Sequence, residues 1–143
     1  MIIRRALVTD LFELSRLWLG MCQEDDPTLT PDLQMWRDYV VSLMGYKGYF
    51  MFVAEEDNHL IGFIDYIMQT EPGKGILIAV INYFYVLPEF RKSGISGQLW
   101  RTAIDSAKEN KAMEFVSMCF PKRYEFWKKH GFEQYSHGIR SVI

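Results

Sequence analysis

Residues 76–87 constrain the fold more than any other segment, because nearly every residue in this run is apolar or aromatic. Such a run is typical of a central strand that is buried on both faces of a sheet. It leads through a turn of basic and small residues, Arg91 to Gly97, into a predicted helix that starts at about Gly94. The helix repeats apolar residues at a four-residue step, namely Ile95, Leu99, Ala103 and Ala107. We therefore expect a buried strand that continues directly into a helix.

Two helices and three strands are predicted before this unit, beginning with a short strand at Ile2, Ile3 and the two arginines that follow. Asp10 with Glu13 three residues later has the spacing of a capping box and predicts the first helix start. Thr30 is expected as the N-cap of the second helix, with Pro31 in its first turn. Strands are predicted at residues 49–55 and 60–69, joined by a hairpin turn at residues 57–59.

The segment after the central helix supplies the remaining elements. A short strand is predicted at residues 114–118, then a helix opened by Pro121, then two terminal strands broken at Gly138. The order of elements indicates a mixed α/β layer. No repeat, low-complexity tract or linker divides residues 1–143, so we expect a single domain.

Composition excludes several classes of function. The 143 residues are 49% hydrophobic, which is enough for a sizeable core, and 16 basic against 18 acidic side chains give a net charge of -2. A general attraction to nucleic acid is therefore not expected. No run has the length of a membrane span or of a signal peptide. With Cys22 and Cys119 expected as reduced thiols, we predict a cytoplasmic protein without a membrane partner.

The turn from Arg91 to Gly97 has the features of an anion site. Amides at a helix N-terminus lack intrahelical partners, and the helix dipole adds roughly half a positive charge there. Gly94 and Gly97 allow phosphate oxygens to approach the backbone, while Arg91 and Lys92 can neutralise negative charge. The pattern favours a pyrophosphate ligand, although basic and small residues are also ordinary in surface turns.

Two motifs carry a resemblance to a known family. The segment Tyr85-Val86-Leu87-Pro88-Glu89-Phe90-Arg91-Lys92-Ser93-Gly94-Ile95-Ser96-Gly97-Gln98-Leu99 resembles the acetyl-CoA signature of the GNAT acetyltransferases. The segment Phe126-Trp127-Lys128-Lys129-His130-Gly131-Phe132 is similar to the motif near the end of the same family. Both occur in the family's order, and the two N-terminal helices fit as well, so the resemblance covers nearly the whole chain.

The resemblance implies a mostly antiparallel, twisted sheet with flanking helices. A splayed pair of parallel strands, here residues 76–87 and 114–118, would hold the pantetheine arm of acetyl-CoA. An amine acceptor would then attack the thioester directly. The implied cofactor-binding residues are Tyr85, Val86, Arg91, Lys92, Ser93, Gly94, Ile95, Ser96, Gly97 and Trp127.

The sequence departs from the family pattern at the catalytic positions. Asn82 stands where many relatives carry a glutamate, and an amide cannot accept a proton in that role. Trp127 replaces the tyrosine usually proposed as general acid, and its indole N–H can donate a hydrogen bond but not a proton. Ser96 replaces a glycine or alanine of the loop, which Gly97 directly after it makes tolerable.

Tyr124 and Asp65 are the remaining candidates for proton transfer. Tyr124 lies one helical turn before Trp127 and can act as the acid, or it can pack in an aromatic cluster with Phe120. Asp65 is the single carboxylate within an apolar strand pattern, so it lies on the solvent face or in the cleft with a raised pKa. Alternatively, a chain of water molecules past Asn82, Tyr83 or Tyr85 carries the proton from the amine to bulk solvent.

Other candidate residues have simpler explanations. Cys119 is expected to pack rather than to act as a nucleophile, and His130 is expected to cap the end of its helix rather than to catalyse. Neither His59 nor His137 is expected to bind metal. The acidic residues from Glu24 to Asp26 form a solvated turn or contact a cationic amine. The acceptor is not identified, and both a monomer and a homodimer fit the sequence.

Three functions stay open. The first is an N-acetyltransferase that uses acetyl-CoA to modify a primary amine of a small molecule or a protein. The second is a catalytically weak or inactive module of the same fold that binds acyl-CoA or a protein partner, which Asn82 and Trp127 favour. The third is an unrelated nucleotide-binding α/β domain, which the order of elements disfavours.

Overall fold

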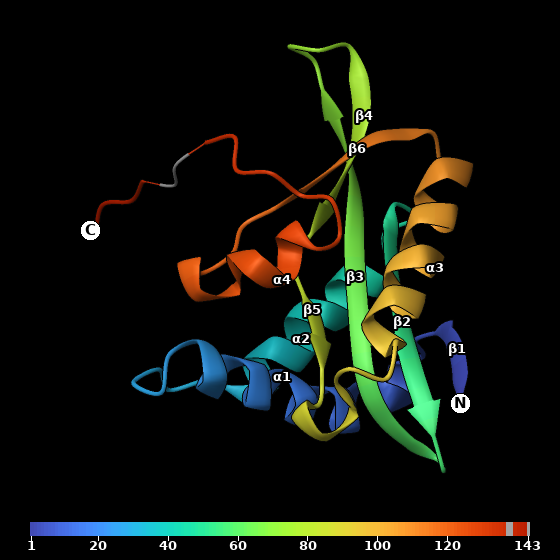
Figure 1. The fold of residues 1–143 in the computed structure, drawn as a ribbon, viewed down its shortest axis with the longest axis vertical. Coiled ribbons are helices and arrows are strands. Elements are labelled where there is room, and N and C mark those ends of the chain that lie inside the picture. The colour runs from blue at the N-terminus through green and yellow to red at the C-terminus, as the bar shows by residue number, and fades with distance from the viewer. Residues whose placement is uncertain (137–138, 143) are drawn as a thin grey trace.

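A mixed six-stranded sheet with helices on both faces makes up the protein (Figure 1), and the computed structural model describes residues 1–136 and 139–142. This confirms the predicted α/β class. The strands are β1 (Ile2–Arg5), β2 (Tyr49–Glu56), β3 (His59–Glu71), β4 (Ile76–Ile81), β5 (Phe84–Val86) and β6 (Ala112–Ser117). The helices are α1 (Leu11–Asp25), α2 (Leu33–Met44), α3 (Ile95–Glu109) and α4 (Tyr124–Lys128), with 3-10 helices η1 (Val8–Asp10), η2 (Pro88–Phe90) and η3 (Pro121–Arg123).

The sheet is mostly antiparallel and contains one parallel strand pair. Its order is β1-β2-β3-β4-β6, and β5 pairs with β3 beside this path. β4 and β6 run parallel, with the register ending at Ile81 opposite Ser117. Beyond this point β5 continues along β3, while the chain after β6 turns into η3. The parallel strands therefore separate after Ile81, as the resemblance implies.

The apolar run 76–87 was predicted as one strand, and this prediction is wrong. The structure divides it into β4 and β5 at Asn82 and Tyr83. Val80 pairs with Ile67 and Phe84 pairs with Ile64. The segment from β4 to β5 therefore contains one residue more than the part of β3 that it faces. An extra residue in one strand of an antiparallel pair is a β-bulge, which bends the strand.

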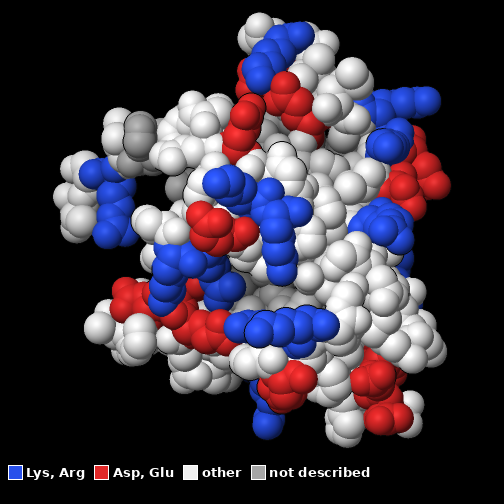
Figure 2. Space-filling model, viewed as in Figure 1, with Lys and Arg blue, Asp and Glu red and all other residues white. Residues whose placement is uncertain are grey.

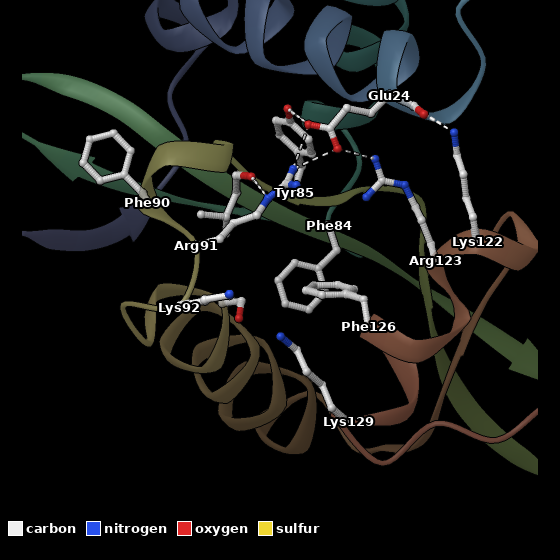
Figure 3. Close-up of a pocket in the computed structure, with 12 residues that line it drawn as sticks. Glu24, Phe84, Tyr85, Phe90, Arg91, Lys92, Lys122, Arg123, Phe126 and Lys129 are labelled. Carbon is white, nitrogen blue, oxygen red and sulfur yellow. Dashed lines mark hydrogen bonds and ion pairs between the residues drawn. The ribbon is translucent and has the colours of Figure 1, made fainter.

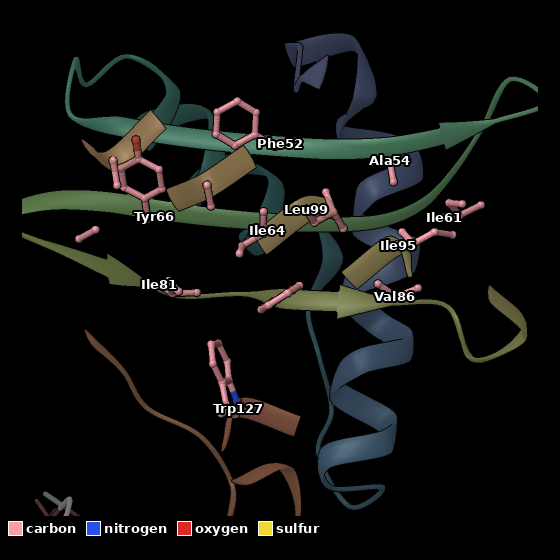
Figure 4. Close-up of a cluster of buried hydrophobic side chains, with 14 residues drawn as sticks. Phe52, Ala54, Ile61, Ile64, Tyr66, Ile81, Val86, Ile95, Leu99 and Trp127 are labelled. Carbon is pink, nitrogen blue, oxygen red and sulfur yellow. The ribbon is translucent and has the colours of Figure 1, made fainter. Parts of the chain in front are cut away.

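Two apolar cores lie on opposite faces of the sheet. On one face α3 buries the predicted stripe Ile95, Leu99, Ala103 and Ala107 against β3 and β5, together with Trp127 of α4 (Figure 4). On the other face α1 and α2 pack against β2, β3 and Tyr85 of β5. Side chains alternate between the faces of a strand, so neighbouring residues of β5 enter different cores.

Both N-terminal helices form, but only the first begins where it was predicted. Asp10 is the N-cap residue of α1, yet its side chain makes no cap hydrogen bond, because its carboxylate accepts from Leu7 N and from the Arg4 guanidinium at 2.7 to 2.9 Å. α2 begins with Asp32, whose side chain accepts from Met35 N at 2.8 Å, rather than with Thr30. Several polar residues near each start satisfy the local rule, and tertiary contacts decide between them.

The hairpin between β2 and β3 is confirmed. Its turn has Asp57 and Asn58 at φ 50° and 62°, the left-handed pair that a type I′ turn requires. At the other end of the chain, residues 133–136 and 139–142 contain no strand where two were predicted, and His137 and Gly138 lie outside the described residues. None of the described helices is long and apolar enough to cross a membrane.

Candidate functional site

A cavity of about 500 Å³ lies beside β5, beyond the point where the parallel strands β4 and β6 end their pairing. Its walls come from β5, the turn before α3, the start of α3, the end of α1, and η3 with α4 (Figure 3). Figure 2 shows Lys and Arg side chains gathered around a hollow on this face. The lining residues are Glu24, Phe84, Tyr85, Val86, Phe90, Arg91, Lys92, Ser96, Lys122, Arg123, Phe126 and Lys129.

The free edge of β5 forms one wall of this cavity. Residues 84–86 pair with β3 on one side, with Tyr85 opposite Phe63 and Val86 opposite Gly62. Within the described residues no strand pairs with the other side of β5. Backbone groups on an unpaired strand edge remain available to an extended ligand.

The turn before α3 has the conformation expected of an anion site. Gly94 precedes the helix with φ +86°, a conformation that a side chain would strain. The amides in the first turn of a helix have no intrahelical partner, and among the described residues no side chain caps α3, so these amides remain available to a ligand. Lys92 and Ser96 line the cavity beside this helix start. The arrangement can bind a phosphate group.

Arg91 faces the cavity, but its guanidinium is already bonded within the protein. Its Nε donates to Val86 O at 2.9 Å, and its terminal nitrogen donates to both Glu24 carboxylate oxygens at 2.9 and 3.0 Å. Glu24 also accepts from the Tyr85 hydroxyl at 2.9 Å. Burial, and then the Glu24 carboxylate, raise the pKa of Tyr85 to about 12, so this hydroxyl stays protonated. The Glu24 carboxylate of α1 thus offsets part of the positive charge that Arg91 was predicted to offer a ligand.

The opposite wall carries cationic residues that were not predicted as site residues from the sequence. Lys122, Arg123 and Lys129 all line the cavity, and Arg123 pairs with Asp25 and lies 3.5 Å from Glu24. Spacing in the sequence could have indicated part of this wall, because residues three apart on a helix share one face. Arg123, Phe126 and Lys129 follow this spacing and all reach the cavity.

Asp65 lies neither on the solvent face nor in the cavity wall. It is 0% exposed, and its carboxylate accepts from the Tyr49 hydroxyl at 2.6 Å and from the amides of Asn82 and Tyr83 at 3.1 and 2.8 Å. Burial raises the pKa of Asp65 to about 6, against the opposing effect of these hydrogen bonds. Asn82 itself is exposed and does not line the cavity.

The two candidates on α4 also lie outside the cavity lining. The Tyr124 hydroxyl accepts a hydrogen bond from Gln134 N at 3.2 Å. Trp127 is 6% exposed and packs edge-on against Phe84 and Phe132, and its Nε1 has no hydrogen-bond partner among the described residues. Phe84 and Phe126 face the cavity in its place.

Apart from the buried Trp127, the predicted cofactor residues divide into two groups. Five of them line the cavity with their own atoms, namely Tyr85, Val86, Arg91, Lys92 and Ser96. Ser93, Gly94, Ile95 and Gly97 build the turn and the helix start, and the Ile95 side chain is buried in the core. In the described part of the chain, no group of three or more His, Cys, Asp or Glu residues is placed to hold a metal ion.

Comparison with known proteins gives a family model and many structural neighbours. The model described as acetyltransferase (GNAT) family matches residues 10–132. No curated protein sequence matches the chain.

Three solved structures illustrate the likeness, and at this identity they establish the fold alone. An aminoglycoside antibiotic 6'-N-acetyltransferase from Acinetobacter haemolyticus is 20% identical, with a TM-score of 0.81 over 100% of this chain and 98% of its own. A predicted acetyltransferase with acetyl-CoA from Clostridium acetobutylicum is 18% identical, with a TM-score of 0.83 over 99% and 95%. Glucosamine-6-phosphate N-acetyltransferase from Arabidopsis thaliana is 16% identical, with a TM-score of 0.78 over 99% and 97%.

Proposed function

The chain belongs to the acetyltransferase (GNAT) family, and we propose that it transfers an acetyl group from acetyl-CoA to a primary amine of a small molecule or a protein. One observation supports this proposal most directly: the free edge of β5 and the uncapped start of α3 lie side by side in one wall of the cavity. An extended arm can pair with the strand edge while its phosphates lie at the helix N-terminus. The relatives named above support the reaction type, since their names include acetyltransferases that act on aminoglycosides and on glucosamine-6-phosphate.

The residues present fit the chemical groups of acetyl-CoA. Lys92, Lys122 and Lys129 bring cationic side chains to the cavity and can neutralise phosphate groups. Phe84 and Phe126, whose ring centroids lie 4.9 Å apart, offer an apolar surface for the arm. We propose the predicted set from Tyr85 to Gly97 as the cofactor-binding residues, and Trp127 as their support through Phe84.

The chemistry needs little covalent participation by the protein. The amine nitrogen attacks the thioester carbonyl, the carbon–sulfur bond breaks, and the acceptor loses one proton while the thiolate gains one. The chain must therefore position the reactants and conduct these protons. We propose Tyr124 as the proton donor, acting on the thiolate through a water because its side chain does not line the cavity itself. Its hydroxyl oxygen accepts a hydrogen bond from Gln134 N, which orients the ring.

Acetyl-CoA binding and turnover are separable tests of this proposal. Incubation with acetyl-CoA and a panel of primary amines should release free thiol, and acetyl-CoA should raise the unfolding midpoint, since a ligand of the folded state stabilises it. Absence of any stabilisation would contradict both binding and catalysis.

Charge reversal in the turn tests the location of the phosphates. Arg91→Glu places a carboxylate beside Glu24 in the cavity and should weaken acetyl-CoA binding at least tenfold in calorimetry. Lys47→Glu makes the same charge change on an exposed residue away from the cavity and should leave affinity within twofold. Asp65→Asn should weaken binding far less than Arg91→Glu; equal effects would mean that the phosphates bind elsewhere.

A second function is favoured by the departures at the catalytic positions. Asn82 is exposed outside the cavity lining and Trp127 offers no transferable proton, so an inactive module that binds acyl-CoA fits the same cavity. Tight acetyl-CoA binding without thiol release from any amine would support this second function over the first.

A further inference from the structure

The β-bulge between β4 and β5 lies directly opposite Asp65 of β3. Asp65 N donates to Tyr83 O at 3.1 Å, which keeps one backbone hydrogen bond across the bulge. The amides of Asn82 and Tyr83 both donate to one oxygen of the Asp65 carboxylate, at 3.1 and 2.8 Å. In a regular strand, successive N–H groups alternate between the two edges. The carboxylate therefore stabilises a backbone conformation that the sheet ladder alone does not provide.

Successive amides that converge on one anion form a concave anion site known as a nest. Here the anion belongs to the protein and is fully buried. Its second oxygen accepts from the hydroxyl of Tyr49, a residue of β2 that is 3% exposed. The carboxylate thus connects the bulge to the centre of the sheet through β3 and β2.

The bulge is the point at which the cavity becomes possible. Before it, β4 pairs with β6 up to Ile81; after it, the edge of β5 that no described strand pairs with faces the cavity. A bulge bends the strand and increases its twist. The orientation of Tyr85 and Val86 toward the cavity therefore depends on the geometry three residues earlier.

We infer that Asp65 is a positioning residue: by holding the amides of Asn82 and Tyr83, it fixes the bulge that directs the free edge of β5 toward the acyl-CoA arm. This inference rests on the proposed function. It assigns Asp65 a role that works through the backbone, without contact to the reacting atoms. Proton acceptance by Asp65 is the competing role.

Substitutions that separate geometry from basicity test the inference. Asp65→Asn keeps an oxygen that can accept both amides but removes the base, whereas Asp65→Ala removes the acceptor. Positioning predicts that Asp65→Ala weakens acetyl-CoA binding at least tenfold in calorimetry, while Asp65→Asn stays within about threefold and retains turnover. Proton acceptance predicts instead that both variants lose turnover equally and bind acetyl-CoA normally, which would overturn the inference.

Amide hydrogen exchange measured by NMR gives a readout without any ligand. Exchange at Asn82 and Tyr83 should quicken at least tenfold in Asp65→Ala and less in Asp65→Asn, because these amides lose their acceptor only in the first variant. Unchanged exchange in Asp65→Ala would also overturn the inference. If Asp65→Ala does not fold, Asp65→Asn still decides, since loss of turnover with intact binding contradicts positioning.

Tyr49→Phe is the matched control for a general loss of stability. It removes a buried hydrogen bond to the same carboxylate but leaves the oxygen that holds the bulge. Acetyl-CoA affinity should stay within threefold, and a loss as large as that of Asp65→Ala would contradict the inference. Failure of the wild-type protein to bind acetyl-CoA would instead contradict the proposed function, whatever the exchange rates show.

Discussion

Asp65 illustrates at the scale of one residue how burial and hydrogen bonding compete. Removing a carboxylate from water disfavours its charged form, and each donated hydrogen bond favours it. Three donors reach Asp65 and no ion pair does within the described residues, and the pKa nevertheless rises to about 6. The charged carboxylate is therefore retained at neutral pH at a cost in stability.

This cost predicts a pH dependence of the free energy of unfolding. The folded pKa of Asp65, about 6, exceeds its ordinary value of 3.8, so the folded state binds more protons between these pH values. The contribution of Asp65 should be most favourable below pH 4 and should fall by about 3 kcal/mol as the pH rises through 6. Urea unfolding of the wild type and of Asp65→Asn from pH 4 to 7 measures it as their difference, which cancels the other carboxylates. A difference that does not vary with pH would contradict the raised pKa.

The proposed role of Tyr124 gives a second prediction for a single side chain. Tyr124→Phe removes the proposed proton donor and should lower turnover at saturating substrate by about 100-fold, the usual scale of general acid catalysis. Acetyl-CoA affinity should stay unchanged, because Tyr124 does not line the cavity. Tyr135→Phe, at an exposed tyrosine nearby in sequence, is the control. Unchanged turnover in Tyr124→Phe would remove it as the acid.

At the scale of elements, the pairing of β3 with β5 depends on a close backbone approach. A Cβ on Gly62 would lie 2.9 Å from the carbonyl oxygen of Tyr85, and that oxygen cannot move without disturbing the strand pair. Gly62→Ala should therefore destabilise the protein by about 1 to 3 kcal/mol in urea unfolding.

Gly97→Ala is the matched control for this close approach. A Cβ on Gly97 meets no atom within 4 Å, and the residue lies inside α3. The change should be neutral or should stabilise the helix by up to about 1 kcal/mol. Equal destabilisation by the two substitutions would show that the contact at Gly62 is not the cause.

Much of the element order could be predicted from periodicity. The stripe of α3, the hairpin at Asp57 and Asn58, and the family motifs are all local patterns, and the structure contains them. The division of residues 76–87 could not be predicted, because an apolar run does not reveal a bulge. Asn82 was the one polar residue at that point, and its meaning depends on Asp65, which lies on another strand.

The candidate site divides in the same way. The proposed cofactor side is a continuous segment from Tyr85 to Gly97, so a local motif is enough to select it, and five residues of the predicted set line the cavity. The opposite wall comes from η3 and α4, and its relation to α1 exists only after folding. Glu24 could be selected as an acidic residue, but its bonds to Tyr85 and Arg91 depend on the packing of α1 beside β5.

At the scale of the whole molecule, an ion pair and a hydrogen bond join the end of α1 to η3 across the cavity. Arg123 Nε pairs with Asp25, and the Lys122 ammonium donates to the Glu24 carbonyl oxygen. The side chains of Arg123 and Asp25 are 18% and 10% exposed, so water screens their interaction less than it screens a surface pair. The two walls of the cavity are thus held at a defined separation by contacts between distant segments.

This arrangement predicts unequal costs for two similar substitutions. Arg123→Ala leaves the carboxylate of Asp25 largely buried without its partner and should lower the free energy of unfolding by about 2 kcal/mol. Lys74→Ala breaks the exposed pair with Glu114, whose side chains are 58% and 42% exposed, and should cost much less, because water screens this pair. Urea unfolding at neutral pH and low salt measures both. Equal small costs would show that solvent reaches Asp25 freely. The separation of the cavity walls would then depend on how α1 and α4 each pack against their own face of the sheet.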